Sequence, residues 1–277
     1  MTLREALTLG KDLLKQKNIE EYEIDAWLLL ESACQCSRND LYLRGGNSLT
    51  EAQENLYKEY LEKRGNRIPV QHILGVQCFC GLEFEVTPDV LCPRQDTEVL
   101  VEEALKQIRP GSEILDLCTG SGCIILSLLH FTKECRGTGV DLSEKALAVA
   151  KRNSEKLGIP CTWIHSDLFE QIEGIYDVIV SNPPYIATKE IELLEPEVRD
   201  REPRMALDGM EDGLFFYRKI IKESMQYLKP EGWLMFEIGY DQGQAVSEMM
   251  KSAGYTQVTV KKDLAGLDRV VTGKKLT

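Results

Sequence analysis

Apolar residues recur with the period of an α-helix through the N-terminal part of the chain. Positions 3–14 follow this spacing, and the segment 25–33 is apolar nearly all round, as in a buried helix. Thr50 and Gln53 form a capping-box pattern that opens a further helix. No alternating run rich in Val or Ile interrupts this region, so the pattern predicts a small helical domain over residues 1–75.

The period changes from helical to alternating after residue 75. Leu82, Phe84 and Val86 alternate with polar residues, and Gly81 stands at the centre of the segment. Alternation around a glycine is typical of two short strands joined by a tight turn. The pattern predicts a β-hairpin linker over residues 76–94.

From residue 95 to residue 277, predicted strands and helices take turns along the chain. This order is typical of a layered α/β fold with a mainly parallel sheet. Ser143 and Gly158 have the residue types that begin and end one of the intervening helices. We expect strands at 114–117, 138–141, 162–165, 176–180 and 233–237, helices at 213–228 and 241–253, a stop at 229–232, and a terminal hairpin of 257–262 with 269–272.

The charge balance adds limits on partners and location. The net charge is −12, whereas proteins that bind a polyanion normally carry a basic face. No apolar run approaches the roughly 20 residues that cross a bilayer. The N-terminus also lacks the apolar core and cleavage site of a signal peptide. We therefore expect a cytoplasmic protein with no direct nucleic-acid partner and no membrane partner.

The nine cysteines do not indicate disulfide bonds or a metal site. Their number is odd and they are scattered. The pairs Cys34/Cys36 and Cys78/Cys80 are spaced more closely than the usual ligands of zinc. We interpret all nine as reduced thiols and expect no metal. The three histidines are dispersed and are interpreted as structural: His72, His130 and His165.

A glycine-containing loop follows the first strand of the α/β region. Gly120 and Gly122 would let the backbone approach a ligand without a Cβ in the way. The helix that follows offers free N–H groups to polar atoms of that ligand. Two glycines also occur in plain structural turns. Whether this loop binds a ligand therefore has to be judged from the residues that follow the neighbouring strands. The candidate binding residues of the loop are Cys118, Thr119, Gly120, Ser121 and Gly122.

The type of ligand follows from what stands after the next two strands. Ile125 replaces the third glycine of the dinucleotide fingerprint, and the P-loop lysine is absent, which disfavours NAD, FAD and ATP. Asp141 ends the second strand, where a carboxylate accepts ribose hydroxyls; a helix-capping aspartate is the alternative. Asp167 follows the third strand at the level of an adenine ring, or is a turn residue. Adenosine without phosphates favours S-adenosylmethionine, with S-adenosylhomocysteine as product.

The segment Asn182-Pro183-Pro184-Tyr185 directly follows the fourth strand, where ligands of such sheets bind. A planar NH₂ group has two hydrogens; the Asn182 side-chain carbonyl can accept one and the Pro183 main-chain carbonyl the other. The prolines fix φ and remove N–H donors. Tyr185 can pack on a planar substrate and face a developing positive charge. We expect methyl transfer to a planar nitrogen, although Asn-Pro also starts ordinary turns. No residue is indicated as a general base.

At this point the chain resembles the HemK/PrmC family, which methylates the glutamine of the Gly-Gly-Gln motif in class-I peptide release factors. The resemblance covers nearly the whole chain. Beyond the glycine loop and residues 182–185, the segments that carry it are 67–75, 79–86, 90–98, 202–207, 211–213 and 237–239. The resemblance implies a seven-stranded Rossmann-like methyltransferase domain with its last strand antiparallel. It also implies substrate binding by residues 182–185 and cofactor contacts at 118–122, Asp141, Leu168 and Asn182.

Three positions depart from the usual pattern of that family. Cys118 stands where many members have glycine, Leu168 where some have tryptophan, and Met210 where glycine is frequent. These changes leave the polar contacts listed above in place. The stretch 187–212, which follows the fourth strand, has few apolar residues and many acidic ones. It is interpreted either as a solvated loop or as a lid over the substrate.

Two other functions compete with glutamine methylation. The exocyclic amino group of a DNA or RNA base is also a planar NH₂, but its methylation requires a flipped base and phosphate contacts. No long basic run indicates such contacts. A non-catalytic adaptor that only binds the cofactor would require a disrupted Asn182–Tyr185 segment, and this segment is intact.

Overall fold

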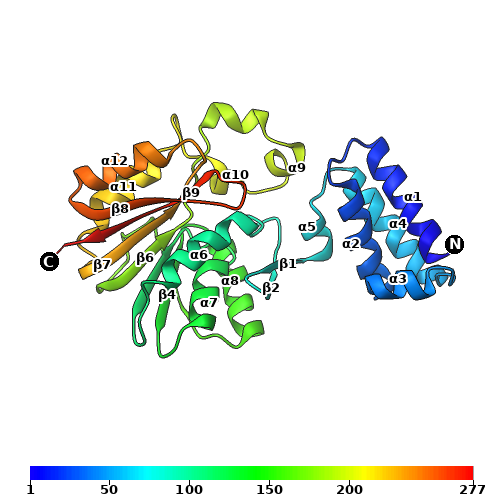
Figure 1. The fold of residues 1–277 in the computed structure, drawn as a ribbon, viewed down its shortest axis with the longest axis horizontal. Coiled ribbons are helices and arrows are strands. Elements are labelled where there is room, and N and C mark those ends of the chain that lie inside the picture. The colour runs from blue at the N-terminus through cyan, green and yellow to red at the C-terminus, as the bar shows by residue number, and fades with distance from the viewer. Residues whose placement is uncertain (277) are drawn as a thin grey trace. The chain divides into compact units, whose positions relative to one another are not determined.

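The structure is a computed structural model that describes residues 1–276, and it divides into two compact units (Figure 1). The helical unit contains Met1–Val76 together with Glu195–Arg201. The sheet unit contains the remainder, residues 77–194 and 202–276. The chain therefore leaves the helical unit after residue 76 and returns to it for seven residues. None of the helices among the described residues is long and apolar enough to pass through a bilayer.

The helical unit is the bundle that the periodicity predicts. Tyr57 lies at its centre, fully buried, and its hydroxyl donates a hydrogen bond of 3.1 Å to the Ala26 carbonyl. Thr50 and Gln53 form the expected capping box. The helices are α1 (Leu3–Gln16), α2 (Tyr22–Cys34), α3 (Arg38–Arg44), α4 (Glu51–Gly65), α5 (Val70–Leu74) and, from the returning segment, α9 (Pro196–Arg199).

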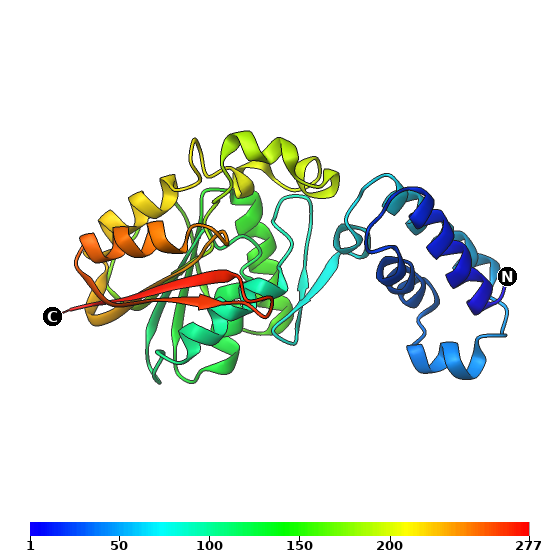
Figure 2. The same ribbon diagram turned by 45° about the horizontal axis from the view of Figure 1, so that its top comes forward.

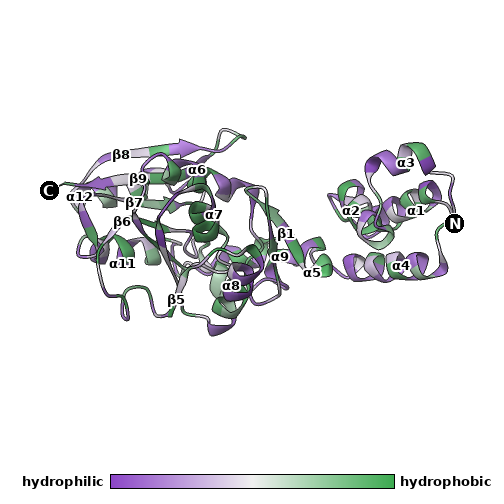
Figure 3. Cartoon of the chain, turned by 90° about the horizontal axis from the view of Figure 1, so that it is seen from below, coloured by the Kyte–Doolittle hydropathy of each residue, from purple (hydrophilic) through white to green (hydrophobic). Residues whose placement is uncertain are grey.

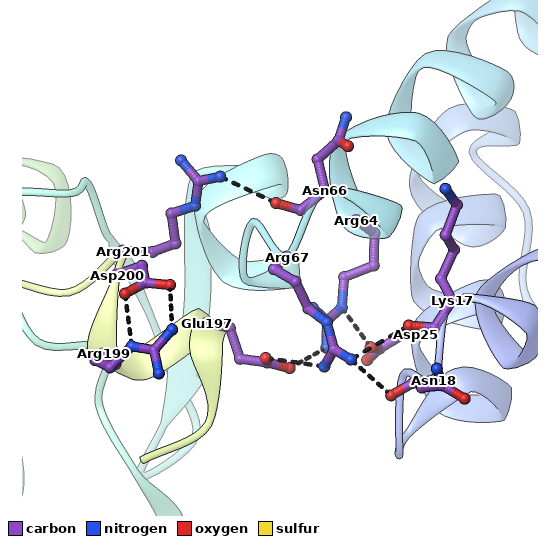
Figure 4. Close-up of polar contacts among 10 residues, drawn as sticks. All are labelled: Lys17, Asn18, Asp25, Arg64, Asn66, Arg67, Glu197, Arg199, Asp200 and Arg201. Atoms are coloured by element: carbon purple, nitrogen blue, oxygen red, sulfur yellow. Dashed lines mark hydrogen bonds and ion pairs between the residues drawn. The ribbon is translucent and has the colours of Figure 1, made fainter. Parts of the chain in front are cut away.

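A buried charge cluster ties the returning segment to these helices (Figure 4). The Arg64 guanidinium donates to Asp25 at 2.7 Å and to Glu197 at 2.8 Å, and Arg67 reaches the other Glu197 oxygen at 3.2 Å. The side chains of Arg64 and Asp25 are 7% and 6% exposed. Burial raises the pKa of Asp25, although the Arg64 contact opposes this. The cluster therefore completes its charge balance with a residue far along the chain.

The sheet unit is a seven-stranded sheet in the order β5-β4-β3-β6-β7-β9-β8. The pairs from β5 to β7 are parallel, and β9 runs antiparallel to both of its neighbours. This confirms the predicted fold class and the antiparallel last strand. The strands are β3 (Glu113–Leu117), β4 (Arg136–Asp141), β5 (Thr162–His165), β6 (Tyr176–Ser181), β7 (Leu228–Glu237), β8 (Tyr255–Lys262) and β9 (Asp268–Lys275), with the separate hairpin β1 (Val76–Phe79) and β2 (Leu82–Glu85).

Helices cover both faces of this sheet (Figures 1 and 2). Alternate strand residues supply two cores: Leu115, Ile179 and Phe236 face α11 and α12, whereas Ile114 and Val180 face α6 and α7. The α7 helix is apolar along nearly its whole length, as its green colour in Figure 3 shows. The helices of the unit are η1 (Gln95–Thr97), α6 (Glu98–Leu105), α7 (Cys123–Phe131), α8 (Glu144–Leu157), η2 (Thr188–Leu193), α10 (Arg204–Leu207), α11 (Phe215–Ser224) and α12 (Gly243–Ser252).

Two expectations about the second half of the unit need correction. The helix predicted at 213–228 ends at Ser224, and β7 already begins at Leu228, because Leu228 pairs with Tyr176 before a register shift in the β6–β7 ladder. The stretch 187–212 is not a plain solvated loop. It holds three short helices, η2, α9 and α10, and its residues Ile191 and Leu207 are buried.

Candidate active site

The strand order reverses between β3 and β6, since β4 and β5 lie to one side of β3 and β6 and β7 to the other. In such sheets the ligand crevice lies beyond the carboxyl ends of the strands at that reversal. A cavity of about 430 Å³ opens there, within the roughly 300–1,000 Å³ that small-molecule sites span. The predicted residues that line it are Cys118, Thr119, Gly120, Ser121, Asp141, Asp167, Leu168, Asn182 and Pro184; Gly122, Pro183 and Tyr185 lie outside its lining.

The loop after β3 is held from below by a buried carboxyl group. Thr119 donates its hydroxyl hydrogen to Asp116 at 2.6 Å and its main-chain N–H to the Val140 carbonyl at 2.9 Å. Burial raises the pKa of Asp116 to about 7, although the Thr119 hydrogen bond lowers it. These contacts fix the loop from the side of the sheet and leave its other side to the cavity.

The two glycines of the loop have different reasons to be there. Both have positive φ, 55° at Gly120 and 79° at Gly122, a region that glycine adopts without strain. A Cβ on Gly120 would meet no atom within 4 Å, so the missing side chain leaves open space on the cavity wall. A Cβ on Gly122 would lie 2.9 Å from the Trp163 ring. Gly122 therefore serves the packing between the loop and the sheet, and Gly120 the cavity.

Asp141 lies at the end of β4 and faces the loop. One of its carboxylate oxygens accepts the Gly120 N–H and the other the Ser143 N–H, both at 2.9 Å. Burial raises its pKa, although these backbone hydrogen bonds oppose the rise. Each carboxylate oxygen has a second lone pair, so the group can still accept two hydroxyl hydrogens from a ligand. Asp141 is thus both a structural acceptor and a candidate ribose acceptor.

Asp167 and Leu168 follow β5 and line the same cavity. Lys219 lies 3.3 Å from the Asp167 carboxylate, an ion pair that the sequence pattern did not predict. Leu168 has a positive φ of 51°. Cys118 and Met210, which stand where glycine is common in the family that the sequence resembles, also have positive φ, 59° and 69°. The departures from glycine therefore fall where the backbone conformation itself suits glycine.

The Asn182–Tyr185 turn leaves the sheet directly after β6. Ser181 anchors its start by donating to the Leu117 carbonyl at 2.8 Å, and Gln242 donates to the Tyr185 carbonyl at 2.9 Å. Among the described residues, no donor hydrogen-bonds to the Pro183 main-chain carbonyl. The turn is thus fixed at both ends, and Asn182 and Pro184 are its residues that line the cavity.

Gly209, within the acidic stretch, and Gly213, just after it, pack directly against this turn. A Cβ on Gly213 would lie 2.3 Å from the Tyr185 main-chain oxygen, and one on Gly209 would lie 2.8 Å from the Tyr185 Cα. Gly213 also has φ of 73°. Main-chain hydrogen bonds join the same two strips of chain, from Ile186 to Leu207 and from Gly209 to Ile186. The stretch therefore supports the turn, and its residues 203–206 line the cavity.

Two buried carboxyl groups at the site were not identified as functional from sequence. Glu202 is buried and accepts a hydrogen bond of 2.7 Å from Arg94, whose side chain lines the cavity. Glu237 ends β7 and is 2% exposed. Glu237 could have been found from the sequence. It ends the predicted strand 233–237, just as Asn182 follows the predicted strand 176–180, and both strands belong to the parallel part of the sheet. Glu202 could not have been found in this way, because its partner lies 108 positions away.

Comparison with known proteins agrees with this geometry. The pattern of the methyltransferase small domain matches residues 93–196, and that of the PrmC N-terminal domain matches residues 5–75. A crystal structure of a methyltransferase from Pyrococcus furiosus shares the fold, with a TM-score of 0.55 and 19% identity over 71% of this chain and 90% of that one. The open space at Gly120, the remaining acceptor capacity of Asp141 and the size of the cavity fit the cofactor of this class. The chain is an S-adenosylmethionine-dependent methyltransferase.

Relatives with high identity define the family more narrowly. The release factor glutamine methyltransferase of Geobacter sulfurreducens is 42% identical over 274 residues, which cover 99% of this chain and 96% of that protein. The enzyme of the same name from Caulobacter vibrioides is 42% identical over 280 residues, covering 99% and 97%. The chain belongs to the PrmC/HemK family of release factor glutamine methyltransferases.

Proposed function

We propose that this enzyme transfers a methyl group to the side-chain amide nitrogen of the glutamine in the Gly-Gly-Gln motif of class-I peptide release factors. One observation carries the proposal: relatives named for this reaction match 99% of the chain at 42% identity. Asn182 and Pro184 of the intact Asn182–Tyr185 segment line the cavity, which supports it. We also propose that the enzyme acts in the cytoplasm, where its protein substrate is found.

The turn has the acceptors that a planar amide requires. A glutamine amide nitrogen is a weak nucleophile because its lone pair is delocalised, so it must be held with that lone pair aimed at the methyl group. Asn182 accepts one amide hydrogen through its side-chain carbonyl, and Pro183 accepts the other through its main chain. Pro183 and Pro184 are both buried, so the turn keeps this geometry without a substrate. Such prior orientation supplies up to about 7–11 kcal/mol of a bimolecular barrier in ideal cases.

The cofactor side of the cavity has complementary groups. S-adenosylmethionine supplies, when bound, an electrophilic methyl group on a sulfonium sulfur. Residues Cys118–Ser121 line the cavity, and the missing side chain of Gly120 leaves open space on its wall. Asp141 would accept the ribose hydroxyls, and Asp167 and Leu168 would hold the adenine ring, Leu168 as its apolar neighbour.

Tyr185 completes the substrate side. Burial raises the pKa of its phenol, so the ring stays neutral at physiological pH. Its face packs on the planar amide and favours the positive charge that develops on nitrogen. After methyl transfer the amide proton leaves to water.

The experiment offers the enzyme labelled S-adenosylmethionine and three substrates: a class-I release factor, the same factor with the motif glutamine replaced by alanine, and duplex DNA. We expect label only on the intact factor, and mass spectrometry should place one methyl group on the motif glutamine. Label on DNA would instead support methylation of a base, the alternative that the planar NH₂ leaves open. Label on the alanine variant at the same rate would show that another side chain is the acceptor.

A further inference from the structure

The neighbouring parallel strands β6 and β7 end in polar side chains at the same height. Ser181 is paired with Phe236 in the ladder, so the next residues, Asn182 and Glu237, are neighbours at the carboxyl edge of the sheet. Asn182 lines the cavity, whereas Glu237 lies behind it with 2% exposure. A carboxyl group therefore stands directly behind the asparagine that is proposed to hold the substrate.

The surroundings of Glu237 do not satisfy it fully. Its Oε2 atom is buried and has no hydrogen-bond partner among the described residues. Burial raises its pKa to about 7, although the neighbouring Thr97 side chain, the charge of Arg269 and the Asn182 side chain lower it. The other titratable groups that face it are Asp96 of η1, Cys123 of α7, Tyr217 of α11 and Tyr185 of the turn after β6.

The direction of an asparagine amide depends on its neighbours, because its carbonyl and NH₂ ends have nearly the same shape. An ionised carboxylate is only an acceptor, so only the NH₂ end of Asn182 can face Glu237 favourably. The carbonyl end then faces the cavity. The proposed function, on which this inference rests, needs that carbonyl as an acceptor for the substrate amide.

We propose that Glu237 is a positioning residue: its carboxylate accepts a hydrogen from the Asn182 side-chain NH₂ and so holds the Asn182 carbonyl toward the substrate glutamine. When Glu237 is protonated, it donates to that carbonyl instead. The Asn182 NH₂ group then turns to the cavity, where it opposes the NH₂ group of the substrate. The turnover rate therefore follows the ionisation of Glu237 and rises with pH through the neutral range.

The first test compares Glu237→Gln with Tyr217→Phe, using the full chain and an intact release factor. A glutamine at 237 carries both donors and an acceptor and no longer selects one direction of Asn182. We expect kcat to fall about 10- to 100-fold, by analogy with the loss seen when the hydrogen-bond partner of a metal ligand is removed. The dissociation constant of S-adenosylmethionine should stay within about twofold. Tyr217→Phe removes a buried hydroxyl that donates to the Glu237 main-chain carbonyl at 2.9 Å, and should lower the melting temperature but not kcat.

A double-mutant cycle separates positioning through Asn182 from a general structural effect. In an Asn182→Ala background, Glu237→Gln should cost no further turnover, because the amide that it orients is gone. An equal loss with and without Asn182 would overturn the proposal. A loss of kcat in Tyr217→Phe as large as that in Glu237→Gln would overturn it as well.

A pH profile keeps the proposal testable even if Glu237→Gln does not fold. The wild-type kcat, at saturating concentrations of both substrates, should rise through a midpoint in the neutral range. Thr97→Val removes a hydroxyl whose presence lowers the pKa of Glu237, so the midpoint should move to higher pH. An unmoved midpoint, or a flat wild-type profile from pH 6 to pH 8.5, would overturn the proposal. If wild-type enzyme methylates no release factor at all, the proposed function fails and not this inference.

Discussion

Replacing Arg64 with methionine would isolate the charge cluster of the helical unit. Arg64 lies between Asp25 and Glu197, and the change removes the cation while it keeps most of the side-chain volume. Glu197 retains its ion pair with Arg67 at 3.2 Å. Asp25 loses Arg64 and stays buried, and burial disfavours its charged form. The perturbation therefore acts mainly on one carboxyl group.

The loss of stability is limited by the free energy needed to protonate Asp25. The folded chain avoids a stranded charge by protonating Asp25, whose ordinary pKa is 3.8. That costs at most about 5 kcal/mol at pH 7.5 and roughly 2 kcal/mol at pH 5. Removal of one partner from a buried ion pair costs about 3–5 kcal/mol. Because the folded pKa lies above the unfolded one, the lost stability grows as pH rises above 3.8. We expect about 3–5 kcal/mol at pH 7.5 and at most roughly 2 kcal/mol at pH 5.

The assay is a urea series with pulsed hydrogen exchange, read by mass spectrometry on peptides of α2 and α4. This gives the unfolding free energy of the helical unit apart from that of the sheet unit. Asp25→Asn in the Arg64→Met background is the matched control, and it should restore stability at pH 7.5 and change little at pH 5. A loss of the same size at both pH values, or no recovery in the double variant, would refute the reasoning.

Three further predictions concern the site. Asn182→Ala should lower kcat about 10²- to 10³-fold with cofactor affinity within a few-fold by calorimetry; a variant that keeps most of its turnover contradicts the role of this side chain. Gly213→Ala should cost about 1–3 kcal/mol through backbone strain alone, together with most of the turnover, because its Cβ would lie 2.3 Å from the Tyr185 oxygen; an unchanged thermal melt argues against this. Burial raises the pKa of Glu237 from 4.5 to about 7. The free energy of unfolding therefore falls as pH rises between those values, because the folded state must give up a proton that it holds more tightly than the unfolded state does. The difference in unfolding free energy between Glu237→Gln and wild type should therefore shift in favour of the variant by up to about 3 kcal/mol from pH 4.5 to pH 8. Equal differences at both pH values in denaturant unfolding would count against this.

The sequence allowed most of the sheet unit to be predicted because its strands are apolar runs that end in polar residues. Asp141, Asp167 and Asn182 each follow such a run, and the parallel sheet brings them to one cavity. Strand ends are local signals. The roles of these residues in binding stay proposals, since their placement at the cavity is all that the structure adds.

What the sequence did not reveal depends on contacts between distant segments. Nothing periodic connects Arg64 with Glu197, which is 133 positions away, or Arg94 with Glu202. The early start of β7 was missed because Lys229 to Gly232 has the composition of a turn. These residues lie in the register shift of the β6–β7 ladder, whereas Leu228 just before them pairs with Tyr176 of β6. Pairing energy from a neighbouring strand overrides local propensity in such places.

The seven residues from 195 to 201 have a consequence for the order of folding. During synthesis the first helices leave the ribosome well before these residues do, so Arg64 and Asp25 are at first without the carboxylate of Glu197. The N-terminal bundle then reaches its final charge balance only after much of the sheet region has been translated. For the same reason, no single cleavage of the chain yields two fragments that each contain one whole unit.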